Sequence, residues 1–235
     1  MRASAVHLDN VSGRQAILTG DGEQAKAKAV ALMLHGGKEE SLAPVAERQV
    51  AVMRMGPLAS HLIRAGAGDG LAVWRLRFRY RGWNDAAHPI EDVEWAVRQM
   101  RIRHGDAPIV IVGHSMGGRA ALRAAGENGV AAVLGLAPWL PDGEPTEQLA
   151  GRRILVVHGS RDRITDAQRS REFVREARSS AQEAAYIGLR HCGHAMMRRM
   201  RLWHRLTEDF VFYAGLGREP SGPLADALSA GDWVV

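Results

Sequence analysis

Short apolar runs alternate with amphipathic stretches along most of this chain. The runs are rich in Val, Ile and Leu and last only a few residues, which is typical of strands buried on both faces. Between them, apolar residues recur every three or four positions among charged ones, as in helices that pack by one face. The expected strands are residues 29–34, 71–80, 109–112, 130–137, 154–159 and 184–189, with a short one near 16–19. The expected helices are residues 44–65 (interrupted at Gly56-Pro57), 89–104, 119–125, 166–178 and 195–213. This alternation predicts an α/β fold with a mostly parallel central sheet and helices on both faces.

The two ends of the chain and one connector depart from the alternating pattern. Residues 1–28 are polar and irregular, and residues 215–235 are rich in Gly and Pro. We expect one α/β domain over residues 1–235, with a core at about 29–214 and a loosely structured tail at 215–235 whose apolar end docks. The polar connector at 140–152 is too short for a helical lid, so we expect no sizeable cap domain and an open cleft.

Composition places the chain among ordinary globular proteins. It has 235 residues, of which 46% are hydrophobic and 24% charged. We find no apolar run of signal-peptide or membrane-spanning length. The single cysteine, Cys192, cannot form an internal disulfide and suits a reducing compartment. A cytoplasmic location is therefore expected.

The positive charge is spread over the chain rather than gathered in a binding motif. The formal net charge is +5, and arginines cluster at 98–103 and 198–205. Apolar residues fall at helical spacing between these arginines, which indicates the solvated face of amphipathic helices. Nucleic acid or an anionic surface is the alternative partner, but no nucleic-acid module is evident. We expect a small-molecule substrate, no nucleic acid and no membrane, and leave the oligomeric state open.

One stretch carries a strong chemical signal. Four β-forming residues, Ile109 to Val112, run into Gly113-His114-Ser115-Met116-Gly117, and an Ala-rich helical pattern follows at once. This strand, sharp turn and helix is the pattern of a nucleophile elbow, where glycines flank the serine because strand and helix pass close together. The alternative is an ordinary Gly-rich turn whose serine caps the helix.

Further chemical groups follow other predicted strands. Gly37 comes after 29–34, Asp162 after 154–159 and His194 after 184–189. Because the carboxyl ends of parallel strands meet at one edge of a sheet, we expect these groups and Ser115 to converge there.

These motifs together resemble the α/β-hydrolase family over roughly residues 29–214. The resemblance rests on His35-Gly36-Gly37, Gly113 to Gly118, His158-Gly159-Ser160-Arg161-Asp162 and Gly193-His194, in the chain order Ser, Asp, His. The compact layout is similar to lid-less members, such as dienelactone-hydrolase-like proteins and small serine esterases. Lys38 stands where hormone-sensitive-lipase-type esterases have a third glycine, which argues against that subgroup.

The resemblance implies a serine hydrolase that acts through a covalent acyl-enzyme. Ser115 would be the nucleophile, His194 its general base, and Asp162 the group that orients the histidine. The backbone N–H groups of Gly37 and Met116 would form the oxyanion hole. An esterase or thioesterase acting on a small acyl substrate is expected, without a cofactor or metal. Short acyl groups are expected because no lid covers the cleft.

Several alternatives remain open at this point. His191 is a second candidate for the base, and Asp142 for the acid. Residues 191–194 offer His191, Cys192 and His194 as metal ligands, but no fourth ligand is evident.

Other residues near the predicted strand ends have two interpretations each. Cys192 is interpreted as a small buried residue and Asp166 as a helix N-cap. His35 either supports the oxyanion loop or is a turn histidine. Trp83 and Trp139 either line a substrate pocket or pack in the core.

The same triad also serves lyase, C–C hydrolase and perhydrolase chemistry. A hydrolase-fold binding protein with an idle triad is the alternative outside enzymes.

Overall fold

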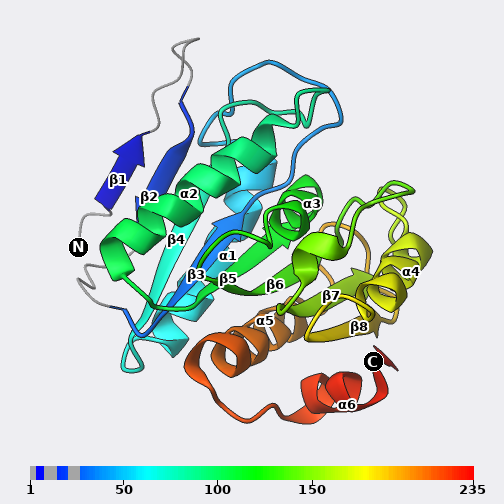
Figure 1. The fold of residues 1–235 in the computed structure, drawn as a ribbon. Helices are drawn as coiled ribbons and strands as arrows, with labels where there is room; N and C mark the ends of the chain where they lie inside the picture. Colours follow the sequence, from blue (N-terminus) through cyan, green and yellow to red (C-terminus); the bar gives the residue numbers. More distant parts are fainter. Residues whose placement is uncertain (1–3, 8–14, 21–26) are drawn as a thin grey trace.

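One sheet runs through the part of the chain that the structure, a computed structural model, describes: residues 4–7, 15–20 and 27–235 (Figure 1). Its spatial order is β1-β2-β4-β3-β5-β6-β7-β8-β9. β2 pairs antiparallel with β1 and β4, and all later neighbours pair in parallel. The strands are β1 Ser4–His7, β2 Ile17–Gly20, β3 Ala29–Leu34, β4 Leu71–Arg77, β5 Ile109–His114, β6 Val130–Leu136, β7 Arg153–Gly159, β8 Glu183–Leu189 and β9 Asp232–Val234. The expected mostly parallel α/β sheet is confirmed.

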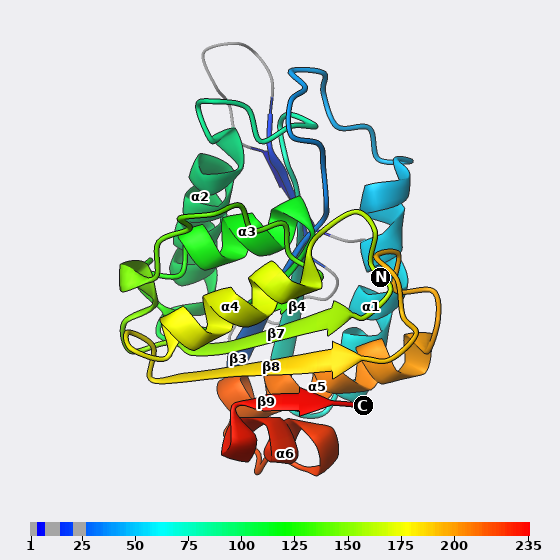
Figure 2. The ribbon, with the colours of Figure 1, turned by 90° about the vertical axis from the view of Figure 1, so that its right-hand side faces the viewer.

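Helices cover both faces of this sheet (Figure 2). On one face lie α2 (His88–His104), α3 (Met116–Arg123) and α4 (Ala167–Ala177), and on the other α1 (Val50–Ala65), α5 (Met200–Leu216) and α6 (Gly222–Ala230). Each face of the sheet packs against its helices in a hydrophobic core. The side chains of β3 alternate between these two cores: Leu32 and Leu34 lie in one, Ala31 and Met33 in the other. A strand buried on both sides needs apolar residues at every position, which is why β3 and β5 appear as unbroken apolar runs.

Two helices begin five or more residues later than the sequence prediction. Helix α1 begins at Val50 rather than at 44, and it continues through Gly56-Pro57 without interruption. Pro57 removes one internal hydrogen bond, but Met55, Leu58 and Leu62 bury their side chains on either side of it and hold the helix in place. Helix α5 begins at Met200 rather than at 195. Met196 and Arg199 adopt φ angles of 59° and 55°, which a continuous α-helix does not allow.

The tail at 215–235 was expected to be loosely structured, with an apolar end that docks. The first part of this prediction was wrong and the second is confirmed. Residues 222–230 form α6, which buries Leu224 and Ala227 completely. The last residues form β9, which pairs in parallel with β8, and Val235 N–H donates to the Gly188 carbonyl at 2.9 Å. The free edge of β8 offers backbone donors and acceptors that a chain end can satisfy, so the apolar terminus docks there as a strand.

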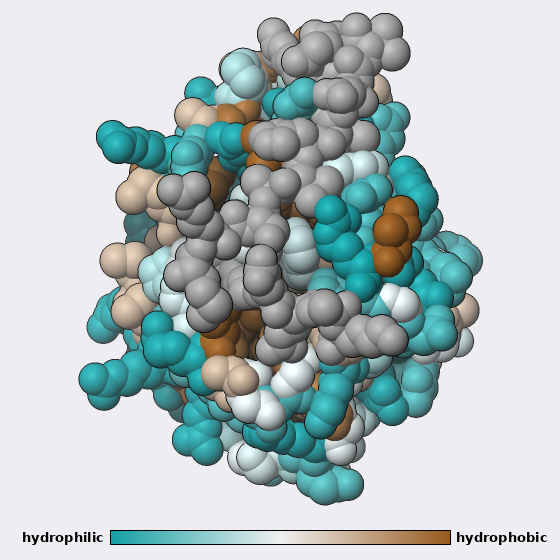
Figure 3. Space-filling view, turned by 90° about the vertical axis from the view of Figure 1, so that its left-hand side faces the viewer, coloured by the Kyte–Doolittle hydropathy of each residue, from teal (hydrophilic) through white to brown (hydrophobic). Residues whose placement is uncertain are grey.

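The connector after β6 contains only one short 3₁₀ turn, Glu147–Leu149, so no cap domain lies over the sheet edge. Seen from the β1 side, hydrophilic residues make up most of the surface drawn in colour (Figure 3). Among the helices of the described residues, none has both the length and the apolar character needed to cross a bilayer.

Candidate active site

Ser115 occupies a sharp turn between β5 and α3. Its φ of 55° and ψ of −120° form a strained conformation for a residue with a side chain. A methyl group added to Gly113 would overlap the Gly117 carbonyl, and one added to Gly117 would lie 2.5 Å from the His35 carbonyl. Strand and helix therefore pass too close for side chains at either glycine, as a nucleophile elbow requires.

The backbone of Ser115 is tied to the neighbouring strand. Its N–H donates to the Leu136 carbonyl at 3.0 Å, and its own carbonyl accepts from Trp139 N–H at 3.1 Å. The Ser115 side chain makes no capping bond to α3 and no hydrogen bond to any described residue. The interpretation of Ser115 as a helix cap is therefore wrong.

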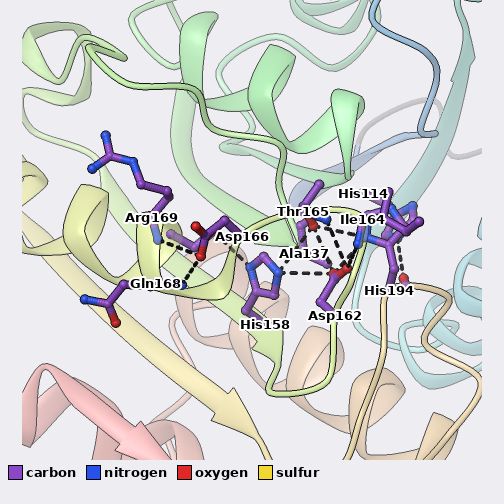
Figure 4. Close-up of polar contacts among 11 residues, drawn as sticks. His114, Ala137, His158, Asp162, Ile164, Thr165, Asp166, Gln168, Arg169 and His194 are labelled. Carbon is purple, nitrogen blue, oxygen red and sulfur yellow. Dashed lines mark hydrogen bonds and ion pairs between the residues drawn. The ribbon is translucent and has the colours of Figure 1, made fainter.

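Asp162 and His194 are joined by a hydrogen bond at the centre of the site (Figure 4). Asp162 Oδ2 lies 2.8 Å from His194 Nδ1, and the Asp162 side chain has no exposed surface. An ionised carboxylate can only accept hydrogen bonds. Nδ1 of His194 therefore carries the proton and donates a hydrogen bond to Asp162. The tautomer that results leaves Nε2 of His194 with a free lone pair, which is the form a general base needs.

Asp162 is surrounded by hydrogen-bond donors. His158 Nε2 lies 3.1 Å and the Thr165 hydroxyl 2.9 Å from Oδ2, while the backbone N–H groups of Ile164 and Thr165 donate to Oδ1 at 2.8 and 3.0 Å. Burial alone would raise the pKa of this carboxyl. The hydrogen bonds from His158, His194 and the backbone outweigh that effect and hold the pKa of Asp162 well below its usual range. The residue is therefore ionised wherever the protein is folded near neutral pH.

His158 and Ser170 extend this network, and the sequence interpretation missed both roles. His158 is fully buried at the end of β7, and its Nδ1 lies 2.9 Å from Ser170 Oγ in α4. Since Nε2 donates to Asp162, Nδ1 accepts from the Ser170 hydroxyl. The spacing of His158, four residues before Asp162, was visible in the sequence; the partner Ser170 was not.

His114 places His194 next to the elbow. His114 Nε2 donates to the His194 carbonyl at 2.9 Å, and the two rings lie 4.7 Å apart. Burial, together with the nearby His194, lowers the pKa of His114 to about 3, so its ring is neutral. Because His114 directly precedes Ser115, this contact brings the His194 imidazole to the nucleophile's side of the sheet edge.

Two backbone N–H groups at this edge are free to bind an oxyanion. Within the described part of the chain, the N–H groups of Gly37 and Met116 donate to no acceptor. A methyl group on Gly37 would overlap the Met116 side chain, so the two residues lie against each other.

His35 supports the Gly36-Gly37 loop. Phe78 N–H donates to His35 Nε2 at 3.2 Å, and His35 Nδ1 donates to the Gly36 carbonyl at 2.7 Å. Burial lowers the pKa of His35 to about 4, so the ring stays neutral and keeps both bonds. The expected hydrogen-bonding support of the loop by His35 is present.

Comparison with known proteins places this arrangement in a family. Residues 55–201, more than half of the chain, match the family described as alpha/beta hydrolase domain. The chain belongs to the α/β-hydrolase family. No match was found among curated protein sequences.

Solved structures with the same fold are similar over most of their length. An alpha-beta serine hydrolase homologue from Coxiella burnetii is 16% identical, over 88% of this chain and 97% of that one, with a TM-score of 0.66. An α/β serine hydrolase without a lid from Xanthomonas campestris is 18% identical, over 95% and 98%, with a TM-score of 0.63. An esterase from Pyrococcus furiosus is 14% identical, over 91% of each chain, with a TM-score of 0.66. At these identities the likeness shows the shared fold.

The geometry of this α/β hydrolase separates Asp162 and His194 from the alternative candidates. Asp142 is 89% exposed and pairs with Arg169 at 2.7 Å, away from His194. His191 is exposed, and its backbone N–H donates to Ser160 Oγ. Neither residue contacts the histidine or the carboxylate of the site.

The remaining candidates have structural roles. Burial raises the pKa of Cys192, as expected for a small buried residue. Asp166 caps α4, accepting from the N–H groups of Gln168 and Arg169, so the N-cap prediction is confirmed (Figure 4). In the described ranges, no group of three or more His, Cys, Asp or Glu side chains is arranged to hold a metal ion.

Trp83 and Trp139 lie together beside the elbow helix. Their rings meet edge to face at 6.2 Å, and the Arg119 guanidinium lies over both, 4.0 and 4.6 Å from the ring centres. Arg119 also pairs with the buried Glu144 at 2.5 Å. The two tryptophans are thus fixed in a packed cluster; their contact with substrate stays a prediction.

Proposed function

We propose that this protein is a serine hydrolase that cleaves a carboxylic ester or thioester through an acyl-enzyme on Ser115. The observation that carries the proposal is the strained Ser115 elbow beside His194, whose Nδ1 is held by a buried, ionised Asp162. A structural turn has no physical need for this combination.

Each group has one task in the proposed reaction. His194 Nε2 takes the proton of the Ser115 hydroxyl as its oxygen attacks the carbonyl carbon, and Asp162 stabilises the imidazolium that results. The N–H groups of Gly37 and Met116 bind the oxyanion. His194 then gives the proton to the leaving alcohol or thiol, and the acyl group stays on Ser115. Water, activated by the same histidine, releases the acid and restores the serine.

One similar protein supports the choice of an ester, and a second supports a site without a lid. The Pyrococcus furiosus structure is named as an esterase, and the Xanthomonas campestris structure as a serine hydrolase without a lid. The short connector of this chain agrees with a site open to solvent, where water can reach an acyl-enzyme.

Labelling with a fluorophosphonate probe tests the proposal, followed by a panel of p-nitrophenyl esters and acyl thioesters. We expect peptide mass spectrometry to find the probe on Ser115, and hydrolysis to yield the free acid. Absence of both labelling and hydrolysis would show an idle triad. Turnover without a free-acid product would assign the triad to another reaction.

A further inference from the structure

An apolar cavity of about 300 Å³ opens beside the residues that follow His194. It lies between the first half of α1 and the start of α5. Its walls are Val50, Met53, Arg54, Pro57, Leu58, Ala195, Met196, Met197, Met200, Trp203 and His204. Its volume falls at the lower end of the range for small-molecule sites.

Solvent-exposed apolar side chains gather around this cavity. Val50 is 70% exposed, Met53 59%, Met197 73% and Met200 45%. A cluster of large, solvent-exposed apolar side chains marks a surface that binds a ligand or another molecule. Methionines suit a variable apolar ligand, since their unbranched side chains adapt to its shape.

The cavity adjoins the proposed catalytic groups. Helix α1 follows β3 and helix α5 follows β8, so both helices begin at the edge of the sheet where Ser115 and His194 lie. Ala195 and Met196, on the cavity wall, directly follow His194. The cavity therefore opens beside the loop that carries His194.

Arg54 adds an uncompensated positive charge to this wall. Its side chain is partly buried, and burial lowers its pKa. It makes no hydrogen bond or ion pair with any residue in the described ranges. Arg79 and Arg119, also partly buried, pair with Asp92 and Glu144. A guanidinium removed from water without such a partner is suited to an anion supplied by a ligand.

The charge of Arg54 also acts on the elbow. Burial is the main cause of the lowered pKa of His114, the residue before Ser115, and the charges of His194 and Arg54 lower this pKa further. An anionic group paired with Arg54 would lie at the wall of the apolar cavity.

We propose that the cavity and Arg54 together bind an amphiphilic carboxylate substrate, with the apolar part among the methionines and the carboxylate on Arg54. This inference rests on the proposed function, because it assigns the cavity to the substrate of the same triad. At roughly 30 Å³ for each water-sized group, the cavity holds on the order of ten non-hydrogen atoms. The cavity supplies the apolar cover that the connector at 140–152 is too short to provide. We therefore expect the protein to accept medium-length acyl groups as well as short ones.

Inhibition of p-nitrophenyl acetate turnover by octanoate, octan-1-ol and acetate tests this site. Octanoate should inhibit competitively and more strongly than acetate. Arg54→Met should raise the inhibition constant of octanoate about tenfold or more, the scale of a lost charge-assisted hydrogen bond, and change that of octan-1-ol little. Met53→Asp should weaken inhibition by both. The matched controls are Arg64→Met, on the exposed end of α1, and Ile102→Asp, 76% exposed on α2.

Three results would overturn the inference. First, octanoate could inhibit Arg54→Met and Arg64→Met equally, which would show that Arg54 binds no carboxylate. Octan-1-ol and octanoate could inhibit no better than acetate, so that the cavity holds no apolar chain. Met53→Asp could split a dimer in size-exclusion chromatography without affecting inhibition, so that the cavity is an interface between copies.

Failure of the proposed function would look different. In that case the protein does not turn over p-nitrophenyl acetate, and calorimetric titration of octanoate into the same variants replaces the inhibition assay. Loss of octanoate binding in Arg54→Met but not Arg64→Met would then still support the site. Equal binding in the two variants would still contradict it.

Discussion

His158 Nε2 lies 3.1 Å from Asp162 Oδ2, the same oxygen that accepts from His194 Nδ1 at 2.8 Å. A fully buried histidine, His158, and a partly buried one, His194, thus point at one carboxylate oxygen, and the Ser170 hydroxyl fixes the ring of His158. His158, itself fixed by Ser170, therefore holds the Asp162 carboxylate in place while that carboxylate orients His194.

Loss of the His158 bond should reduce catalysis without removing any group that touches substrate. We expect His158→Phe to lower kcat by about tenfold to a hundredfold, the scale of a lost hydrogen bond to a charged group, and to change KM little. Ser170→Ala should have a smaller effect in the same direction, because it frees the ring of His158 without removing it. Steady-state kinetics on one ester measures both. Native kcat in His158→Phe would mean that Asp162 needs no such support.

Substitution of Asp162 or His194 should lower kcat far more than substitution of the alternative acid or base. Asp162→Asn should cost about 10⁴-fold in kcat, because the carboxylate sets the tautomer of the base. Asp142→Asn should have no measurable effect, since Asp142 is exposed and paired with Arg169. His194→Ala should likewise abolish turnover, and His191→Ala should not. The reverse result in either pair would reassign the acid or the base.

Folding stability should fall as the pH drops from about 6.5 towards 4. Burial lowers the pKa of His35 to about 4 and that of His114 to about 3, from an ordinary 6.5. In this pH window the unfolded chain binds these protons and the folded protein does not, so acid favours unfolding. Each histidine contributes a slope of roughly 1.4 kcal/mol per pH unit, present in full only while the folded form stays neutral.

Urea unfolding between pH 7.5 and 4.5 measures this slope. The variant His114→Gln should lose the contribution of one histidine, roughly 1.4 kcal/mol per pH unit, even if its stability at pH 7.5 is also lower. The exposed His191→Gln is the control and should keep the wild-type slope. A free energy of unfolding that stays constant across this range would contradict neutral burial of the two rings.

The glycines of the elbow should tolerate no side chain. Gly113→Ala would place a methyl group on the Gly117 carbonyl, where only backbone movement can make room. We expect a loss of roughly 3 kcal/mol or more in the free energy of unfolding, together with loss of activity. Gly126→Ala is the control, because its nearest contacts would lie at an ordinary 3.5 Å. Thermal unfolding of the two variants compares them; equal stability would mean that the elbow is looser than its geometry indicates.

Much of the fold could be predicted because its signals are local. The apolar runs of β3 and β5 and the Gly113-x-Ser115-x-Gly117 turn each fall within ten residues, and the parallel sheet follows from their alternation with helices. Asp162 could be proposed because it directly follows a strand.

Features that depend on distant parts of the chain could not be predicted. The bond from His158 to Ser170 depends on how α4 packs against β7. The docking of the apolar chain end was expected, but its pairing as strand β9 depends on a free edge at β8. The sequence around 215–235 looks irregular because its order comes from that edge rather than from its own pattern. The place of Arg54 in the wall of the cavity likewise arises only when α1 packs beside the start of α5.

The central claim is that Ser115 is the nucleophile, and the measurement that tests it most directly is kcat/KM for ester hydrolysis in Ser115→Ala. We predict a fall of about 10⁶-fold, the scale for loss of a triad nucleophile, with the fold unchanged by circular dichroism. Ser229→Ala, on the exposed side of α6, is the matched control and should keep wild-type kcat/KM. Hydrolysis by Ser115→Ala at a rate near that of the wild type would contradict the account.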